Sequence, residues 1–550
     1  MKRIIYLLGF LGILLSTSCK KILDQAPELD YDEVKVFNDI DLTSQFLTDI
    51  YANTLNRPGS FMDLGNSPLA AACDEADNSF AGTPSDKFQN GSWNASDNPE
   101  SVWGTCYATI RKCNLFLSKI DNVPNKYLGL SKETDLTPQR MKGEAYFLRA
   151  YNYFELLKRY GGIPIIKEPL GAGDEALRLA TRASYDEVVV AILSDLDNCF
   201  NNPEIPLVWF GSNPSNPSLD MNRGNIGRAT KTLVKALKSR LLLYYASPLN
   251  NPSNDLARWQ AAADISKSII ADGKYSLFNS YQNIFLFSDN NEVMLTNQAE
   301  AFNAAVAEPA GIGWGGTNPT QDLIDKYEMK NGKLITDLTS GYDPQDPYKD
   351  RDPRLAASIN YHGVTYQNTV LSMLPGGNQD PAIGGDWTKT GYYMRKFQNA
   401  NSQSGVKRYF PIFRFAEIYL NYAEAQNEAA GPSPDVYEAV NVIRRRAGIA
   451  DLPTGLSQAD LRKRIWNERA VEMAFEKQRF WDVRRWKIAE STLGVPIHGI
   501  RVTKNGDGSL HYNIIKVEDR VFKPEMYLYP VPQSEMDKNP TVLVQNPGWN

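Results

Sequence analysis

Histidine and clustered basic residues are scarce in this sequence. Only three of the 550 residues are histidine, and they are scattered, at His362, His498 and His511. Metal sites usually gather histidine and cysteine at close spacing, so the sequence predicts no metal site and no cofactor. Acidic residues (64) outnumber Lys and Arg (59), and there is no long basic run. Nucleic-acid binding depends on clustered positive charge, so no nucleic-acid partner is expected.

Cysteines are also few, five in all. Cys106 and Cys113 fall on one predicted helix, where their sequence separation corresponds to about 10 Å along the axis. That distance is too long for a disulfide. Cys73 and Cys199 have no evident partner in the sequence, so their disulfide state stays open. The fifth cysteine, Cys19, follows an apolar N-terminal run.

Long hydrophobic runs are absent after the N-terminus, so we expect no membrane-spanning helix. A basic start (KR) precedes the apolar run from Ile4 to Leu15, and small residues precede Cys19. This order is typical of a secretory signal, and a cysteine after small residues is where a lipoprotein is cleaved and lipidated. Leu15 stands one residue further from Cys19 than the usual pattern. We predict a signal peptide at 1–18, a lipid on Cys19 and one exported unit at 19–550; an ordinary secreted protein is the alternative.

The stretch from Leu461 to Trp486 combines aromatic and densely charged residues and contains neither Pro nor Gly. Its apolar residues recur at helical spacing, which predicts one helix of roughly 25 residues, about 38 Å long. Glu468, Glu472 and Glu476 lie four apart, so their like charges stack on one face and repel. We expect other helices to cover this face and supply opposite charges; a solvated charged face is the alternative.

Further helices are predicted on both sides of the chain centre. The segment GEAYFLRAYNYFELLKRY carries a helical stripe at Gly143, Phe147, Ala150, Phe154 and Leu157. Similar runs occupy 42–55, 102–120, 184–200, 229–248, 255–271, 413–429 and 434–449. Small residues at fixed points on paired helices allow close approach, as in stacked helix hairpins. The sequence therefore predicts an all-α scaffold of about four helix pairs, without a fixed repeat period.

Two segments of a different character interrupt these helices, residues 201–225 and residues 275–409. The longer one is rich in Gly, Asn, Asp and aromatic residues and has weak periodicity. An irregular region of this length in a compact chain is usually functional or disordered, and its aromatic content argues against disorder. We interpret it as a loop-rich insertion that carries function.

Several ordered motifs together resemble the SusD/RagB family of outer-membrane nutrient-binding lipoproteins. They include GEAYFLRAYNYFELLKRYGGIPI, KDRDPRLAASINY, RFAEIYLNYAEAQNEA, NERAVEMAFEKQRFWDVRRW and the ending LYPVPQSEMDKNPTVLVQNPGW. The resemblance implies an all-helical fold on four tetratricopeptide-like pairs with a loop-rich ligand-binding face. It further implies a lipid-anchored protein on the cell surface that covers a SusC-like TonB-dependent transporter and passes oligosaccharides or polysaccharides to it.

These motifs belong to the scaffold and do not identify the ligand residues. Sugars stack their C–H faces on flat aromatic rings, and their hydroxyls need polar partners. Trp93 with Asn94, on a loop, fits this need. So does Trp314, because the flanking glycines of GIGWGG leave its ring uncovered. Weaker candidates are Asp74, Tyr342 and Trp209. The alternative for each aromatic residue is ordinary packing on the core.

Three other functions deserve comparison with glycan binding. A peptide-binding lipoprotein of the same transporter-covering type remains an alternative, although the aromatic and Gly-rich loops favour glycan. A glycoside hydrolase needs two carboxylates roughly 5–10 Å apart, and the sequence cannot pair its many acids, so we expect no enzyme. A calcium site is conceivable among acids whose spacing is not that of an EF-hand: Asp343, Asp346 and Asp350.

The N-terminal pattern leads to a prediction about anchoring. Cys19→Ala should move the protein from the membrane to the soluble exported fraction, because stable attachment requires the several acyl chains of a lipoprotein. Fractionation of cells that lack the transporter measures this directly. Undiminished membrane retention of the variant would contradict lipidation at Cys19.

Overall fold

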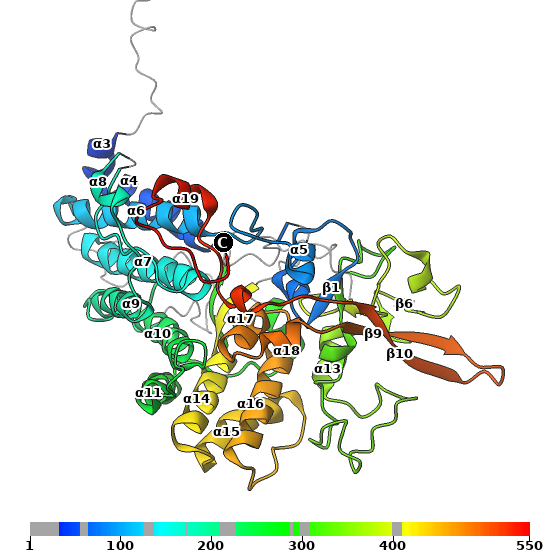
Figure 1. The fold of residues 1–550 in the computed structure, drawn as a ribbon. Helices are drawn as coiled ribbons and strands as arrows, with labels where there is room; N and C mark the ends of the chain where they lie inside the picture. The colour runs from blue at the N-terminus through cyan, green and yellow to red at the C-terminus, as the bar shows by residue number, and fades with distance from the viewer. Residues whose placement is uncertain are drawn as a thin grey trace, which may run out of the picture.

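A curved row of helices forms one side of the molecule in the computed structural model (Figure 1). The structure describes residues 32–55, 64–65, 67–125, 137–171, 173–208, 227–286, 290–297, 308–398 and 410–549. The first helices are α3 (Glu33–Phe37), α4 (Ile40–Leu55), α5 (Pro84–Asn90), α6 (Trp103–Lys119), α7 (Pro138–Tyr160), α8 (Glu175–Arg178), α9 (Tyr185–Phe200), α10 (Lys231–Ala246) and α11 (Leu256–Ala271). The later ones are α12 (Gln321–Ile324), α13 (Pro353–Ser358), α14 (Phe415–Ala430), α15 (Pro434–Ala447), α16 (Gln458–Glu472), α17 (Gln478–Arg485), α18 (Ala489–Leu493) and α19 (Gln533–Lys538).

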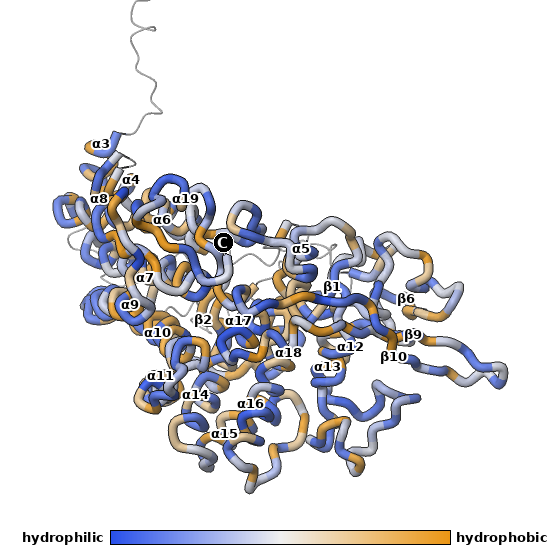
Figure 2. Tube along the Cα trace, viewed as in Figure 1, coloured by the Kyte–Doolittle hydropathy of each residue, from blue (hydrophilic) through white to orange (hydrophobic). Residues whose placement is uncertain are grey.

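Successive helices of the row pack against one another. Helix α6 contacts α7, α7 contacts α9, α9 contacts α10, α10 contacts α11, and α11 contacts α14, which also packs on α15 and α16. The predicted helical runs are confirmed within a few residues at their ends, and so is the scaffold of stacked helix pairs. Apolar residues recur along these helices (Figure 2). Those of α4, α6, α7 and α9 and much of α10 form one large core, whereas α15, α16 and most of α11 belong to a second cluster with parts of α10 and α14.

Helix α7 illustrates why the sequence folds in this way. Thr137 caps its start by accepting a hydrogen bond from the Arg140 N–H, and Pro138 occupies the first turn, where its missing N–H costs nothing. Gly161, with φ of 71°, ends the helix. A Cβ on Gly143 would lie 2.8 Å from Ile205. The predicted stripe is therefore buried, and its glycine allows a neighbouring segment to approach closely.

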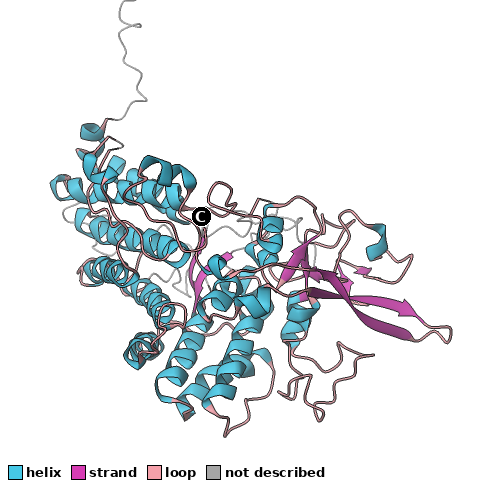
Figure 3. Ribbon diagram, viewed as in Figure 1, coloured by secondary structure: helices cyan, strands magenta, loops and turns pink. Residues whose placement is uncertain are grey.

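Most strands lie on the opposite side of the molecule, and one pair lies near its centre, close to the helices (Figure 3). The described residues form two-stranded antiparallel sheets, which pair β1 (Ala76–Asn78) with β3 (Thr317–Pro319), β2 (Val293–Asn297) with β8 (Phe410–Arg414), β4 (Ile359–Asn360) with β7 (Tyr393–Met394), β5 (Thr365–Tyr366) with β6 (Thr369–Val370), and β9 (Ile497–Lys504) with β10 (Leu510–Glu518). The β9–β10 hairpin extends away from the helices (Figure 1). This hairpin is not among the elements predicted from the sequence.

The prediction of one continuous helix from Leu461 to Trp486 is wrong. Helix α16 ends at Glu472 and α17 begins at Gln478. Between them Phe475 and Lys477 adopt left-handed backbone conformations, with φ of 64° and 63°. The break leaves carbonyl groups at the end of α16 without helical partners. The buried side chains of Lys396 and Arg414 donate hydrogen bonds to carbonyl oxygens here instead.

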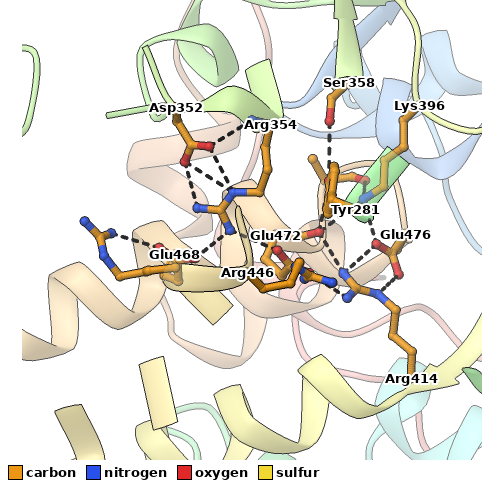
Figure 4. A network of polar contacts seen from close by, with 12 residues as sticks. Tyr281, Asp352, Arg354, Ser358, Lys396, Arg414, Arg446, Glu468, Glu472 and Glu476 are labelled. Carbon is orange, nitrogen blue, oxygen red and sulfur yellow. Dashed lines mark hydrogen bonds and ion pairs between the residues drawn. The ribbon is translucent and has the colours of Figure 1, made fainter. Parts of the chain in front are cut away.

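The row of glutamates at the end of α16 is fully buried and paired with basic side chains (Figure 4). Arg414 binds the carboxylates of Glu472 (2.6 Å) and Glu476 (2.7 Å). Arg354 binds Glu468 and Glu472, and Lys396 binds Glu476 at 2.6 Å. The partners come from a strand and from loop segments as well as from helices. The solvated alternative is therefore wrong.

These contacts shift the acid–base properties of the buried groups. Burial raises the pKa of Glu472, but the guanidinium groups around it, those of Arg446, Arg414 and Arg354, outweigh burial and hold its pKa well below the ordinary value. Burial lowers the pKa of Lys396 to about 8, although the Glu476 carboxylate opposes this shift. Each charge in the cluster depends on its opposite neighbours, because an unpaired buried charge is costly.

No helix within the described residues is long and apolar enough to cross a membrane. The four cysteines in the described part of the chain are free and buried, at Cys73, Cys106, Cys113 and Cys199. Cys19 lies outside the described residues, as do the other residues of the predicted signal peptide.

The buried stripe of α7 yields a stability prediction. Phe154 is fully buried, so Phe154→Ala should lower the free energy of unfolding by about 3–5 kcal/mol. Val190→Ala, on the exposed side of α9, is the control and should change it by no more than about 0.5 kcal/mol. Denaturant unfolding of both variants measures the difference. An equal loss of unfolding free energy in the two variants would show that the α7 stripe is not part of the core.

Candidate functional site

A cavity of about 600 Å³ opens among the loops on the strand side. Three regions that are distant in sequence line it: the turn after β1, the loop before β7, and the β9–β10 hairpin, which contributes residues from both strands. Its walls include Phe80, Trp387, three basic residues and one carboxylate. The full lining comprises Ser79, Phe80, Ala81, Pro381, Gly384, Gly385, Asp386, Trp387, Thr388, Lys389, Arg501, Ile515, Lys516 and Val517.

The buried side chain of Asn318, in β3, joins the loops around this cavity. Its Nδ2 donates to the Gly315 carbonyl oxygen at 2.7 Å, and its Oδ1 accepts from the Lys389 N–H at 3.0 Å. The β1–β3 pairing continues beyond the strands, because the Ser79 N–H donates to the Gly316 carbonyl oxygen at 2.8 Å. Together, the two hydrogen bonds of the Asn318 side chain and the Ser79–Gly316 backbone hydrogen bond hold three loops in one arrangement.

Trp314 is 52% exposed; it does not line the cavity itself but stands on a turn that touches the cavity loop at Asp386. The next residue, Gly315, has φ of 73°, and a Cβ there would overlap the Asp386 carbonyl oxygen. Only glycine permits this approach, so the Trp314 turn rests directly on the loop that carries Trp387. The indole N–H of Trp387 donates to the Asn378 carbonyl oxygen at 3.3 Å, which orients its half-buried ring.

Polar groups also line the cavity. The Lys389 ammonium lies 3.5 Å from the buried carboxylate of Asp77, which also accepts a hydrogen bond from Gln89. The Ser79 hydroxyl is buried and has no hydrogen-bond partner among the described residues. A site with one exposed and one half-buried aromatic ring, an ammonium group, a carboxylate and a hydroxyl can take a ligand that has both apolar faces and many hydroxyls.

The prediction that Trp93 is an exposed platform is wrong. Its side chain is 2% exposed, and its ring packs against Phe88 and Tyr529, each with centroids 5.0 Å away, and against Trp549 at 4.6 Å. Two of these partners come from the C-terminal end of the chain. A ring covered on so many sides cannot stack on a ligand, so the core-packing alternative holds for Trp93.

Asp74 is buried as well, 5% exposed, and its carboxylate forms two hydrogen bonds of 2.8 Å with Arg479. Burial raises the pKa of Asp74, but Arg479 and Lys326 outweigh burial and bring that pKa to about 2. Asp74 is thus a structural anion, and the prediction that it contacts ligand does not agree with its position.

The remaining predicted residues do not gather at the cavity. The exposed Asn94 accepts hydrogen bonds from the Ser96 and Asp97 N–H groups, so its side chain stabilises its own loop. The ring of Tyr342 is half-buried beneath the Arg351 guanidinium, 5.2 Å from its centroid. Trp209 lies outside the described residues. Of the predicted set, the structure places only Trp314 next to the cavity.

Trp387, Lys389 and Arg501 line the cavity but are not among the site residues predicted from the sequence. The same signal that pointed to Trp314, glycines beside a tryptophan, also occurs at Gly384-Gly385 before Trp387. Lys389 and Arg501 had no local signal, because they reach the site through the pairing of distant segments. The possible calcium ligands are not supported either: no group of three or more His, Cys, Asp or Glu that could hold a metal ion occurs in the described ranges.

A second cavity, of about 590 Å³, lies between α6 and the segments that contain α8 and α19. Trp103 and Tyr107 line it, but their rings pack on each other with centroids 5.1 Å apart. The Tyr107 hydroxyl donates to the Pro164 carbonyl oxygen at 2.7 Å. Within the described part of the chain, Trp103 and Tyr107 are the aromatic residues that line this cavity, and both are engaged within the protein.

Comparison with known proteins identifies the family to which this protein belongs. The sequence profile of the SusD family matches residues 270–549, about half of the chain, and a profile described as "Starch-binding associating with outer membrane" matches residues 23–202. The protein belongs to the SusD family.

Individual relatives agree with this assignment. The chain is 23% identical over 518 residues to SusD-like protein P2 of Formosa agariphila, covering 90% of this chain and 87% of that protein. A solved SusD-like protein from Bacteroides fragilis is 28% identical, with a TM-score of 0.74 and coverage of 94% and 98%. A structure titled a SusD-like carbohydrate binding protein, from the same species, is 25% identical, with a TM-score of 0.74 and coverage of 92% and 99%.

The contact between Gly315 and Asp386 leads to a prediction. Gly315→Ala adds a methyl group where the Asp386 carbonyl oxygen lies, so it should destabilise the protein by about 1–3 kcal/mol more than backbone strain alone. Gly311→Ala is the matched control, because Gly311 has φ of 78° but no atom within 4 Å of its added Cβ. Denaturant unfolding compares the two. Equal losses would mean that the two loops are not packed as described.

Proposed function

We propose that this protein binds glycans at the cavity beside Trp314. The observation that carries the proposal is an exposed tryptophan and a polar cavity held side by side by Asn318. The Trp314 and Trp387 rings offer flat surfaces for the C–H faces of sugars. Lys389, Asp386 and the Ser79 hydroxyl offer donors and acceptors for sugar hydroxyl groups. Ligand sites commonly combine apolar walls with a few fixed polar groups in this way.

The comparisons support this choice of ligand class. A relative of similar fold and 25% identity is titled a carbohydrate binding protein, and the profile matching residues 23–202 is described as starch-binding. Starch as such is not implied for this chain, because the loops that line the cavity, not the helical scaffold, would select the sugar.

We further infer that the protein binds its glycan without hydrolysing it. Hydrolysis of a glycosidic bond ordinarily uses two carboxylic acids that face each other across the bond. Asp386 is the only carboxylic acid among the described residues that line the cavity. A single carboxylate can accept hydrogen bonds from sugar hydroxyls, but it lacks the partner that acid–base catalysis requires.

We also propose where in the cell the protein acts. A lipid on Cys19 would hold the protein at the outer membrane, on the cell surface, and the captured oligosaccharide would pass to a SusC-like TonB-dependent transporter. The outer-membrane description of the matching profile supports this location. The N-terminal pattern of basic, apolar and small residues before Cys19 supports the anchor.

Trp314→Ala tests the site. Stacking on an aromatic ring contributes on the order of 1–3 kcal/mol in the related case of nucleic-acid bases, and 1.4 kcal/mol corresponds to tenfold in affinity. The variant should therefore bind glycan about tenfold more weakly, with little change in stability, because half of the ring is already exposed. Affinity gels that contain a panel of polysaccharides identify a ligand, and calorimetric titration with its oligosaccharides measures the loss.

Trp93→Ala is the control for this test. Its buried ring should make it strongly destabilising, by about 3–5 kcal/mol, with no specific effect on the site while the protein remains folded. Unchanged glycan affinity in Trp314→Ala would remove Trp314 from the site. Titration of a peptide panel in parallel decides the alternative: binding of peptides and of no glycan would contradict the proposed function.

A further inference from the structure

The charged residues that line the cavity favour one kind of glycan over others. Resting on the proposed glycan-binding function, we propose that this cavity is specific for acidic glycans, and that Arg501 binds an anionic group on the sugar, a uronate carboxylate or a sulfate ester. A neutral glycan would need no cation at this place.

Arg501 is a partly buried cation that lacks an ion-pair partner among the described residues. It forms no ion pair and no hydrogen bond through its guanidinium with any described residue, and its Nη1 is buried and unsatisfied. Burial lowers the pKa of Arg501, and the charge of Asp380 offsets this only in part. Both carboxylate oxygens of Asp380 already accept backbone hydrogen bonds, from Ala382 and Gly376. An arginine left in this state lacks the oxyanion that would compensate its lost hydration.

The backbone around Arg501 is held firmly against the cavity wall. The N–H of the preceding residue, Ile500, donates to the Thr390 carbonyl oxygen at 2.7 Å. A Cβ on Gly499 would lie 2.5 Å from the same oxygen, so the strand is in close contact with this loop. Ile515 lies opposite Gly499 in the hairpin and also lines the cavity. Arg501 is thus presented to the cavity by the fold and not by a mobile loop end.

The other charged groups at the cavity favour the same sign of ligand. Lys389 and Lys516 line it with Arg501, against the single carboxylate of Asp386. Lys389 is balanced by Asp77 at 3.5 Å, and Lys516 by Asp519 at 2.9 Å, although the second pair is more than half exposed and therefore weakly bound. Of the three, only Arg501 forms no ion pair with a described carboxylate; Asp380 acts on it from further away. The planar fork of Arg501 matches a carboxylate or sulfate through two parallel hydrogen bonds.

The experiment compares charged and uncharged forms of the same sugar chains. The probes are oligogalacturonate and its carboxyl-reduced form, and oligosaccharides of a sulfated galactan and their desulfated form, titrated calorimetrically into the full mature chain. We expect one acidic probe to bind at least about tenfold more tightly than its neutral counterpart. That binding should weaken as salt is raised from about 0.05 M to about 0.5 M, because salt screens charge pairs. The carboxylate and sulfate arms distinguish the two sources of negative charge.

Three variants assign the preference to the residue. Arg501→Met should abolish the preference for the acidic probe and change neutral-sugar affinity by less than about twofold. Arg501→Lys should keep part of it, because the charge remains while the fork is lost. Arg178→Met, at an exposed arginine of α8, is the control and should behave as the unaltered protein. A thermal melt of each variant verifies folding.

The outcomes separate this inference from the function on which it rests. Equal binding of acidic and neutral probes, or a preference that survives Arg501→Met, overturns the acidic-glycan inference and leaves glycan binding intact. Binding of no probe, together with no retention in gels of the wider neutral and acidic polysaccharide panel, overturns the proposed function itself. An acidic preference that Arg501→Met removes supports both.

Discussion

The need to neutralise a row of buried carboxylates governs the centre of this structure. Glu468, Glu472 and Glu476 are four residues apart and almost fully enclosed, so each requires a cation nearby. The cations come from α13, β8 and α15 and from the segment after β7, as Arg354, Arg414, Arg446 and Lys396. Because a buried charge without its partner is strongly destabilising, these segments can pack here only together. The cluster thereby ties the long insertion to the helical scaffold.

The break between α16 and α17 follows from the same constraint. Lys396 donates to the carbonyl oxygens of Glu472 (3.1 Å) and Ala474 (2.9 Å), and Arg414 donates to that of Glu472 at 2.7 Å. A continuous helix would direct these carbonyls to N–H groups one turn later. The chain instead accepts two left-handed residues, Phe475 and Lys477, each costing about 1–2 kcal/mol, and satisfies the buried ammonium with carbonyl oxygens. Local strain is here offset by tertiary hydrogen bonding.

The candidate site depends on this rigid centre while drawing its residues from loops. Its lining comes from three regions, and Asn318 and the β1–β3 pairing set their spacing. Loops positioned by a rigid scaffold are where binding residues commonly lie. The helical scaffold and the cavity lining are thus carried by different segments of the chain.

Apart from the break between α16 and α17, the sequence by itself determined the main helices, their stacked pairs and the family, because periodic apolar residues, caps such as Thr137 and ordered scaffold motifs are local signals. Only the tertiary structure decided which tryptophan is exposed. Trp93 and Trp314 both lie in Gly- and Asn-rich surroundings, yet Tyr529 and Trp549 cover the first, whereas the second remains open. It likewise decided that the glutamate row is buried and that Arg501 reaches the cavity. Burial depends on which distant segments pack over a residue, and no spacing along the chain encodes that.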